Sequence, residues 1–211
     1  KGVCLNAVPV EVSELLRDSL FDRGFSVVMT SATLTVNNRM DYYKQRIGAE
    51  SAADLTVSSP FDFENQVELF LAESLPEPNA ADFTDKAAEK VRFLLEKTQG
   101  KAFVLFTSYS MMRKTAEELR GFFYEQGLRL YVQGEGVPRT KMLDNFKKET
   151  NSVLFGTASF WTGVDVPGEA LSNVIIVKLP FAVPDHPLVA ARQEMLEKKG
   201  GNSFYDYSLP E

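Results

Sequence analysis

The feature that most constrains the fold is a regular alternation of short apolar runs with amphipathic helical segments in the second half of the chain. The apolar runs are residues 102–107, 128–132, 152–157 and 173–179, and the helical segments are 111–124, 139–148 and 185–199. Strands that are apolar along their whole length and alternate with helices are typical of a parallel sheet covered on both faces. The sequence therefore predicts an α/β fold built on such a sheet.

The first half of the chain is less regular. Apolar residues recur at helical spacing in 11–22, 38–47 and 82–98, whereas 25–30 and 67–71 are short apolar runs that predict strands. The chain has 211 residues and no internal repeat, so we expect a single domain over residues 1–211.

The net charge of −6 is unevenly distributed. Residues 50–99, a proline-punctuated segment within the expected domain, carry eleven acidic and four basic side chains. Residues 101–160 carry nine basic and six acidic ones. Because binding depends on where charges cluster, the overall acidity does not exclude a nucleic-acid partner.

Cysteine content and hydropathy indicate the compartment. Cys4 is the single cysteine, so no internal disulfide is expected and the chain suits a reducing compartment such as the cytoplasm. No apolar run approaches the roughly 20 residues of a membrane-spanning helix, so no membrane partner is expected. The chain opens with Lys1-Gly2 rather than with Met, which indicates a piece of a longer protein.

Ligands of open parallel α/β sheets bind beside the carboxyl ends of the strands, so the segments that follow strands form the candidate site. TSATL (30–34) and TSYS (107–110) each follow a predicted strand and are rich in hydroxyls. Small hydroxyl residues let backbone N–H groups approach a phosphate. They also form helix caps and strand-to-helix turns, the interpretation that each motif alone favours, and Ser108 and Ser110 are good cap candidates.

The segment LFGTASFWTGVDVPGEAL (154–171) is the most informative one. Thr157 ends a predicted strand, and the aromatic pair Phe160 and Trp161 follows. Such side chains either stack on unpaired bases, worth about 1–3 kcal/mol per base, or pack in the core. Asp165 suits a ribose hydroxyl or a structural turn better than general-base catalysis, because no histidine accompanies it.

Several catalytic sites are excluded by what the sequence lacks. It contains no G-x-x-x-x-G-K-[ST] phosphate-binding loop, no acidic pair placed to hold Mg²⁺ and no serine–histidine triad motif. Cys4 alone cannot form a metal site. We therefore expect neither a catalytic residue nor a metal ion within these residues.

Six motifs occur in a defined order along the chain. They are TSATL (30–34), SSPFDF (58–63), LFTSY (105–109), QG (133–134), FGTASFWTGVDVPGEAL (155–171) and IIVKLPFAVPDHP (175–187). The series resembles the second motor domain of DinG-type DNA helicases, superfamily 2 relatives of the XPD group. The resemblance implies a RecA-like domain that clamps ATP and Mg²⁺ against a first motor domain of the same chain. In this family the pair moves from 5′ to 3′ along single-stranded DNA.

The resemblance also implies residue roles, position by position. Contact with the nucleotide, or coupling of its state to the interdomain hinge, is implied for Thr30, Ser31, Ala32, Thr33, Gly163 and Asp165. Contact with DNA is implied for Thr107, Ser108, Tyr109, Gln133, Gly134, Thr157, Ser159, Phe160 and Trp161. The residues that are candidates for phosphate contact, or for an ordinary solvated helix face, are Arg113, Lys114, Arg139 and Lys141.

The sequence departs from the family pattern in two places. Thr162 stands where relatives commonly carry Glu between the Trp and the Gly, so the role of that carboxylate is not carried over to this chain. The element that supplies an arginine finger is expected shortly after Leu209-Pro210, beyond the last residue of the chain. Because the phosphate-binding loop is also missing, we expect these residues alone to be inactive. An iron–sulfur cluster or a nuclease domain in the longer protein would depend on sequence outside these residues.

Two other classes of function remain open on composition alone. One is the nucleotide- or phosphate-binding half of a two-domain transferase, which would bind nucleotide without preferring single strands. The other is an interaction module that docks through the acidic segment 50–99 and binds neither nucleotide nor DNA. The ordered motif series favours the helicase motor domain over both.

Overall fold

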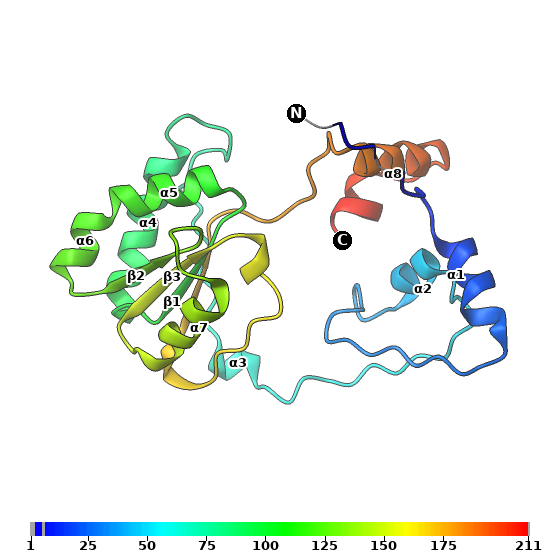
Figure 1. Ribbon diagram of the computed structural model, residues 1–211, viewed down its shortest axis with the longest axis horizontal. Coiled ribbons are helices and arrows are strands. Elements are labelled where there is room, and N and C mark those ends of the chain that lie inside the picture. Colours follow the sequence, from blue (N-terminus) through cyan, green and yellow to red (C-terminus); the bar gives the residue numbers. More distant parts are fainter. Residues whose placement is uncertain (1–2, 6, 211) are drawn as a thin grey trace. The chain divides into compact units, whose positions relative to one another are not determined.

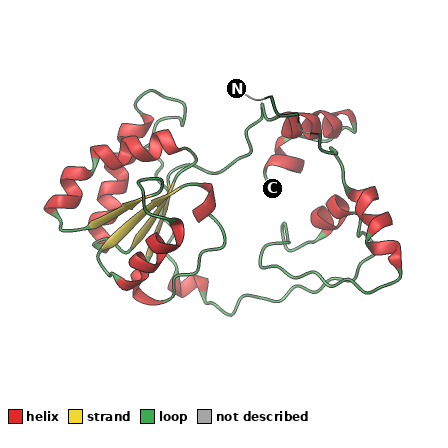
Figure 2. Cartoon of the chain, viewed as in Figure 1, coloured by secondary structure: helices red, strands yellow, loops and turns green. Residues whose placement is uncertain are grey.

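The chain divides into two compact units. The computed structural model describes residues 3–5 and 7–210. Unit 1 comprises residues 1–68 and 181–211, and unit 2 comprises residues 69–180. Every named strand belongs to unit 2, whereas the described part of unit 1 consists of helices and loops (Figure 2). The N-terminal segment packs with the C-terminal helix, which brings residues from both ends of the chain into unit 1.

Unit 2 is built on a parallel sheet of four strands. The strands are β1 (Ala102–Leu105), β2 (Arg129–Val132), β3 (Ser152–Gly156) and β4 (Asn173–Ile176). Their order is β2-β3-β1-β4, and Ala102 of β1 lies opposite Val153 of β3 on one side and Asn173 of β4 on the other. The α/β class and the parallel sheet predicted from the alternation are confirmed.

Helices cover both faces of this sheet (Figure 1). The helices α4 (Phe83–Thr98), α5 (Tyr109–Glu118) and α6 (Arg120–Glu125) pack on one face, and α7 (Arg139–Lys148) packs on the other. The helix α5 begins where Ser108 accepts a hydrogen bond from the backbone N–H of Met111 at 3.3 Å. Ser108 is therefore the N-cap, one of the two roles open to it from the sequence.

Each face of the sheet has its own apolar core. Successive side chains of a strand point to opposite faces, so Phe103 and Val104 enter different cores. Phe106 and Phe155 are fully buried on the α4–α6 face, and Phe146 is fully buried on the α7 face. Burial of each such side chain stabilises the fold by about 1.5–3 kcal/mol. These two cores hold the strand ends, and hence the segments that follow them, in place.

Unit 1 contains short helices joined by polar contacts. Its elements are α1 (Ser13–Ser19), a 3₁₀ turn (Phe21–Arg23), α2 (Asp41–Ile47), α3 (Phe63–Gln66), α8 (Pro187–Lys198) and a π-helical turn (Phe204–Ser208). Arg17 of α1 donates to the carbonyl of Gly48 at 3.2 Å and pairs with Glu50 at 2.7 Å. Arg192 of α8 donates to the carbonyl of Val10 at 3.1 Å, which links the two ends of the chain.

Two predicted strands are absent from the described structure. The run 25–30 has no strand pairing and is mostly exposed, with Val28 85% accessible. The run 67–71 is also without strand pairing, and Leu69 is 80% accessible. An apolar run becomes a strand only when a neighbouring strand completes its hydrogen bonds. The described residues of unit 1 offer only an isolated bridge between Val36 and Arg39, so both strand predictions were wrong for this structure.

Candidate functional site

Three neighbouring strands of unit 2 end at one edge of the sheet. Because β2, β3 and β1 are adjacent and parallel, the segments that follow them emerge side by side at this carboxyl edge. These segments contain Thr107 to Tyr109 after β1, Gln133 and Gly134 after β2, and residues 157–163 after β3. We refer to residues 157–163 as the β3 loop. The topology therefore brings together the strand-end motifs of unit 2 that the sequence singled out.

Gln133 joins all three segments through its side-chain amide. Its Nε2 donates to the hydroxyl of Tyr109 at 2.7 Å and to Ser159 Oγ at 3.0 Å. Its Oε1 accepts from the backbone N–H of Thr157 at 2.7 Å and from the hydroxyl of Thr157 at 2.9 Å. A primary amide has two donor hydrogens and an oxygen with two lone pairs, so every hydrogen-bonding position of this side chain is filled.

Arg139, the first residue of α7, ties the β3 loop to that helix. Its Nε donates to the carbonyl of Ser159 at 3.1 Å, and Nη2 donates to the carbonyl of Gly163 at 3.4 Å. The guanidinium carbon also lies 5.2 Å from the centroid of the Phe160 ring, within the range of a cation–π contact. One side chain thus contacts the loop at Ser159, at Phe160 and at its last residue, Gly163.

The two aromatic residues of the β3 loop have different environments. Phe160 is 2% exposed, and its ring meets Phe103 edge-on at a centroid distance of 6.5 Å. Trp161 is partly buried against the same core, and its Nε1 donates to the carbonyl of Phe106 at 3.3 Å. Phe160 is therefore a core residue in this structure, as in the packing alternative. Trp161 retains an accessible part.

The segment after β1 presents an exposed aromatic ring. Tyr109 is 46% exposed, and Arg113, one turn further along α5, lies with its guanidinium carbon 5.9 Å from the centre of that ring. Gly134 approaches both side chains: a Cβ at this position would lie 3.7 Å from each of them. Gly134 also has φ +87°, a backbone conformation that favours glycine. Thr107 and Ser108 are exposed beside Tyr109.

The positions implied to contact nucleotide fall in different units. Thr30, Ser31 and Ala32 are exposed in a loop of unit 1, and Ser31 Oγ accepts from the backbone N–H of Thr33 at 3.3 Å. In unit 2, Gly163 has φ +67° and is exposed.

Asp165 is exposed two residues after Gly163. Its environment is compatible with contact to a ligand hydroxyl, one of the two roles that the sequence left open. The structure also places Thr162, the departure from the family pattern, at an exposed position of the β3 loop.

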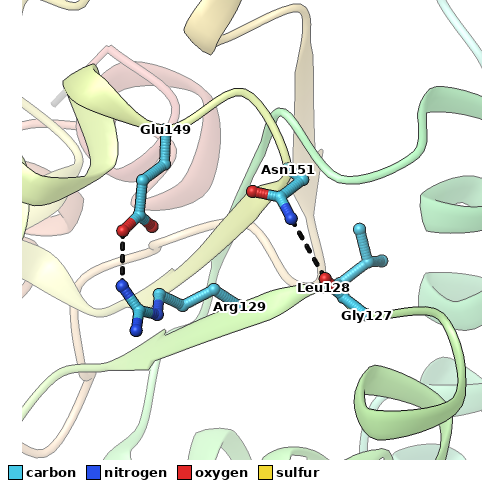
Figure 3. A pocket seen from close by; sticks show the side chains of 5 residues that line it. All are labelled: Gly127, Leu128, Arg129, Glu149 and Asn151. Atoms are coloured by element: carbon cyan, nitrogen blue, oxygen red, sulfur yellow. Dashed lines mark hydrogen bonds and ion pairs between the residues drawn. The ribbon is translucent and has the colours of Figure 1, made fainter.

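A pocket lies at the opposite, amino edge of the sheet (Figure 3). Glu149 faces Arg129 across it at 2.5 Å, and Asn151 donates to the carbonyl of Gly127 at 3.0 Å. Burial raises the pKa of the nearby Tyr131, and its hydrogen bond to Glu149 raises that pKa further. The Glu149 carboxylate thus accepts from both the Arg129 guanidinium and the Tyr131 phenol.

The described residues contain neither a candidate metal-binding group nor a helix that could span a membrane. Over residues 3–5 and 7–210, His, Cys, Asp and Glu side chains form no group of three that could hold a metal ion. None of the helices in that part of the chain has the length and apolar character needed to cross a bilayer.

Comparison with known proteins identifies the family. The model described as "Helicase C-terminal domain" matches residues 91–211, more than half of the chain. The chain belongs to this helicase family. The match covers most of unit 2, including the segments after β1, β2 and β3, so the helicase domain contains the carboxyl edge described above.

Similar curated proteins agree with this assignment. The chain is 38% identical to "3'-5' exonuclease DinG" of Bacillus subtilis, over 100% of the chain and 23% of that relative. It is 41% identical to "ATP-dependent DNA helicase YoaA" of Haemophilus influenzae, over 98% of the chain and 32% of the relative. It is 38% identical to "ATP-dependent DNA helicase DinG" of Photobacterium profundum, over 96% of the chain and 30% of the relative. The resemblance to DinG-type helicases is confirmed, and the chain spans less than a third of the length of these relatives.

The sequence did not predict the side-chain contacts that join the segments at the carboxyl edge. Arg139 was considered only for its charge, but the structure assigns its guanidinium to two loop carbonyls. Lys114, another candidate for phosphate contact, is paired with Asp85 of α4. A signal for Arg139 was present in the sequence, since the first turn of a helix after a strand lies beside the next strand-end segment. The sequence alone does not show which backbone carbonyls Arg139 binds.

Proposed function

We propose that the carboxyl edge of unit 2 contacts single-stranded DNA within a longer ATP-dependent DNA helicase. The observation that carries this proposal is the joining of three strand-end segments at Gln133, which brings the exposed Ser159 close to Tyr109. Thr157 is 5% exposed and its hydroxyl donates to Gln133, so it supports this arrangement from within the protein. Hydroxyls and backbone N–H groups bind phosphate oxygens, and an exposed ring can stack on a base. The names of the YoaA and DinG relatives support DNA as the polymer.

The contacts within this edge divide by accessibility. Exposed Thr107 and Tyr109 and partly exposed Trp161 are the side chains that a strand would touch first. Phe160 supports the β3 loop from below and would not stack on a base without leaving the core. Gly134 allows the chain to pass close to Tyr109. The backbone around Ser108 supplies N–H groups at the start of α5.

Cations around this edge would add salt-dependent affinity. Arg113 and Lys141 are exposed and form no ion pair with the described residues, so they remain available to phosphates. Lys114 is held by Asp85 and is a weaker candidate. Neutralising phosphates releases counterions, so affinity should fall as salt rises.

The nucleotide side of the proposal concerns the longer protein. ATP and Mg²⁺ would be clamped between this domain and a first motor domain of the same chain, with translocation from 5′ to 3′ in the cytoplasm. The bound ATP would supply the free energy of stepping. Exposed hydroxyls at Thr30, Ser31 and Thr33 and the exposed carboxylate of Asp165 are donor and acceptor types that fit phosphate and ribose groups.

The test of the DNA contact is replacement of Tyr109. We expect Tyr109→Ala to weaken binding of a fluorescent oligothymidylate by about tenfold, because stacking on one base is worth about 1–3 kcal/mol. Tyr109→Phe keeps the ring and should retain most of the affinity. Binding is measured by fluorescence anisotropy with single-stranded and duplex DNA across a range of salt concentrations.

Tyr124→Ala is the matched control for this test. Tyr124 is 89% exposed near the end of α6, which leads into the amino end of β2, at the edge of the sheet opposite to the carboxyl edge. Its replacement should leave the affinity unchanged. Equal affinities of the wild type and Tyr109→Ala for single-stranded DNA, or a preference for duplex DNA, would contradict the proposed contact.

A second prediction concerns ATP hydrolysis by the 211 residues alone. Without a phosphate-binding loop, the charge that develops on the transferred phosphoryl group has no cradle. We expect no release of phosphate above a blank at millimolar ATP, with or without single-stranded DNA. Hydrolysis that copurifies with the chain and is lost in Asp165→Asn would contradict this expectation.

A further inference from the structure

We infer that Gln133 and Arg139 act together as a clamp that fixes the conformation of the β3 loop, and that neither side chain contacts the nucleic acid. The inference rests on the proposed function, because it assigns positioning roles within the same edge. It replaces the DNA contact implied for Gln133 and the phosphate contact considered for Arg139.

The hydrogen bonds of Gln133 carry the first part of the argument. Both hydrogens of its Nε2 and both lone pairs of its Oε1 are used within the protein. A contact with a DNA phosphate would require one of these bonds to break. The partners include the backbone N–H of Thr157, which the neighbouring strands do not satisfy. Gln133 therefore acts on the nucleic acid through the exposed Tyr109 and Ser159.

The position of Arg139 carries the second part. Gln133 holds the hydroxyl of Ser159, and Arg139 holds its carbonyl, so this residue is fixed by both clamp members. Arg139 also reaches the carbonyl of Gly163, at the end of the loop implied to face the nucleotide. The planar guanidinium presents several donors in a fixed fork. A lysine ammonium at the same site cannot span both carbonyls with that geometry.

The consequence of the clamp is a pre-organised loop. Ordering a flexible loop on binding costs conformational entropy, and a loop that is already ordered avoids that cost. The clamp also connects Ser159 with Gly163, so a shift at one end of the loop is transmitted to the other. Both clamp residues come from the segment between β2 and the first turn of α7. That segment and the β3 loop should therefore move together.

The decisive variant is Arg139→Lys, which keeps the charge and removes the fork. We expect about tenfold weaker binding of oligothymidylate, as hydrogen bonds from a charged donor are lost. The slope of log affinity against log salt should equal that of the wild type, because no phosphate contact is removed. Wild-type affinity in Arg139→Lys, together with a slope reduced by about one in Arg139→Met, would overturn the inference.

A readout without DNA comes from Trp161, the only tryptophan of the chain. Because Trp161 lies in the β3 loop, acrylamide should quench its fluorescence more strongly in Arg139→Lys and in Gln133→Met than in the wild type. Lys141→Met, two residues further along α7, is the control and should leave the quenching unchanged. Thermal melting confirms that each variant is folded at the measuring temperature.

The two readouts separate the inference from the proposed function. If the wild type does not bind single-stranded DNA, the proposed function fails, and the clamp is judged by quenching alone. If the wild type binds but quenching is unchanged in both variants, the clamp fails and the function stands. Increased quenching together with weaker binding at an unchanged salt slope supports both.

Discussion

Phe160→Ala is expected to destabilise unit 2 by about 3–5 kcal/mol, the usual cost of removing a buried phenylalanine ring. Phe160 is 2% exposed and packs edge-on against Phe103 on the α7 face of the sheet. The substitution would leave a cavity beneath the β3 loop and would also remove the ring that Arg139 overlies. The decrease in the free energy of unfolding therefore has two causes, the lost burial of the ring and the weaker attachment of the β3 loop.

Urea denaturation followed by Trp161 fluorescence measures this effect, since the single tryptophan reports on unit 2. Phe93→Ala is the control, because Phe93 on α4 is 53% exposed. Its replacement should change the free energy of unfolding by about 0.5 kcal/mol or less. A similar small change for Phe160→Ala would show that the ring is not part of the core.

Gly156→Ala is expected to cost about 2–3 kcal/mol, although it adds a single methyl group. A Cβ on Gly156, the last residue of β3, would lie 2.7 Å from Cγ and 2.8 Å from Cβ of Phe160. These atoms belong to the rigid base of a buried side chain, so relief requires the β3 loop to move. The variant should also bind single-stranded DNA more weakly than the wild type.

Gly121→Ala provides a control of opposite sign for the same chemical change. Gly121 lies within α6, and a Cβ there meets nothing within 4 Å. Alanine is preferred to glycine inside a helix by about 0.5–1 kcal/mol, so this variant should be slightly more stable. Urea denaturation gives the free energy of unfolding of each variant, and the two values are comparable where the fitted m-values are equal. Equal stability of both would mean that the close approach of Gly156 to Phe160 relaxes without cost.

The sheet of unit 2 could be predicted from the sequence because its signals are local. Each of the four apolar runs in the second half of the chain became a strand, and the segments 111–124 and 139–148 became helices. The runs 25–30 and 67–71 carry the same local signal, yet they are not strands. Strand formation requires a partner that supplies hydrogen bonds, and partner choice depends on residues distant in the sequence.

The candidate site was also predictable in part. Parallel strands end at one edge, so the motifs after β1, β2 and β3 had to lie near one another. The distribution of roles within the edge was not predictable. Phe160 and Trp161 are adjacent and both aromatic, yet one is in the core and the other is partly accessible. Their difference arises from a 3₁₀ turn at Ala158–Phe160, which directs the Phe160 ring inward.

The sequence by itself determined the α/β class, the strands of unit 2 and the helicase motif series, because each depends on residue types at short separations. Only the tertiary structure decided which polar groups of the carboxyl edge remain free. The resemblance implies DNA contact for Gln133, and the sequence leaves Arg139 open between phosphate contact and a solvated helix face, but both side chains form hydrogen bonds with distant segments of the protein. Such bonds depend on distances of about 3 Å between groups more than twenty residues apart, and the packing of β2, β3 and α7 establishes those distances.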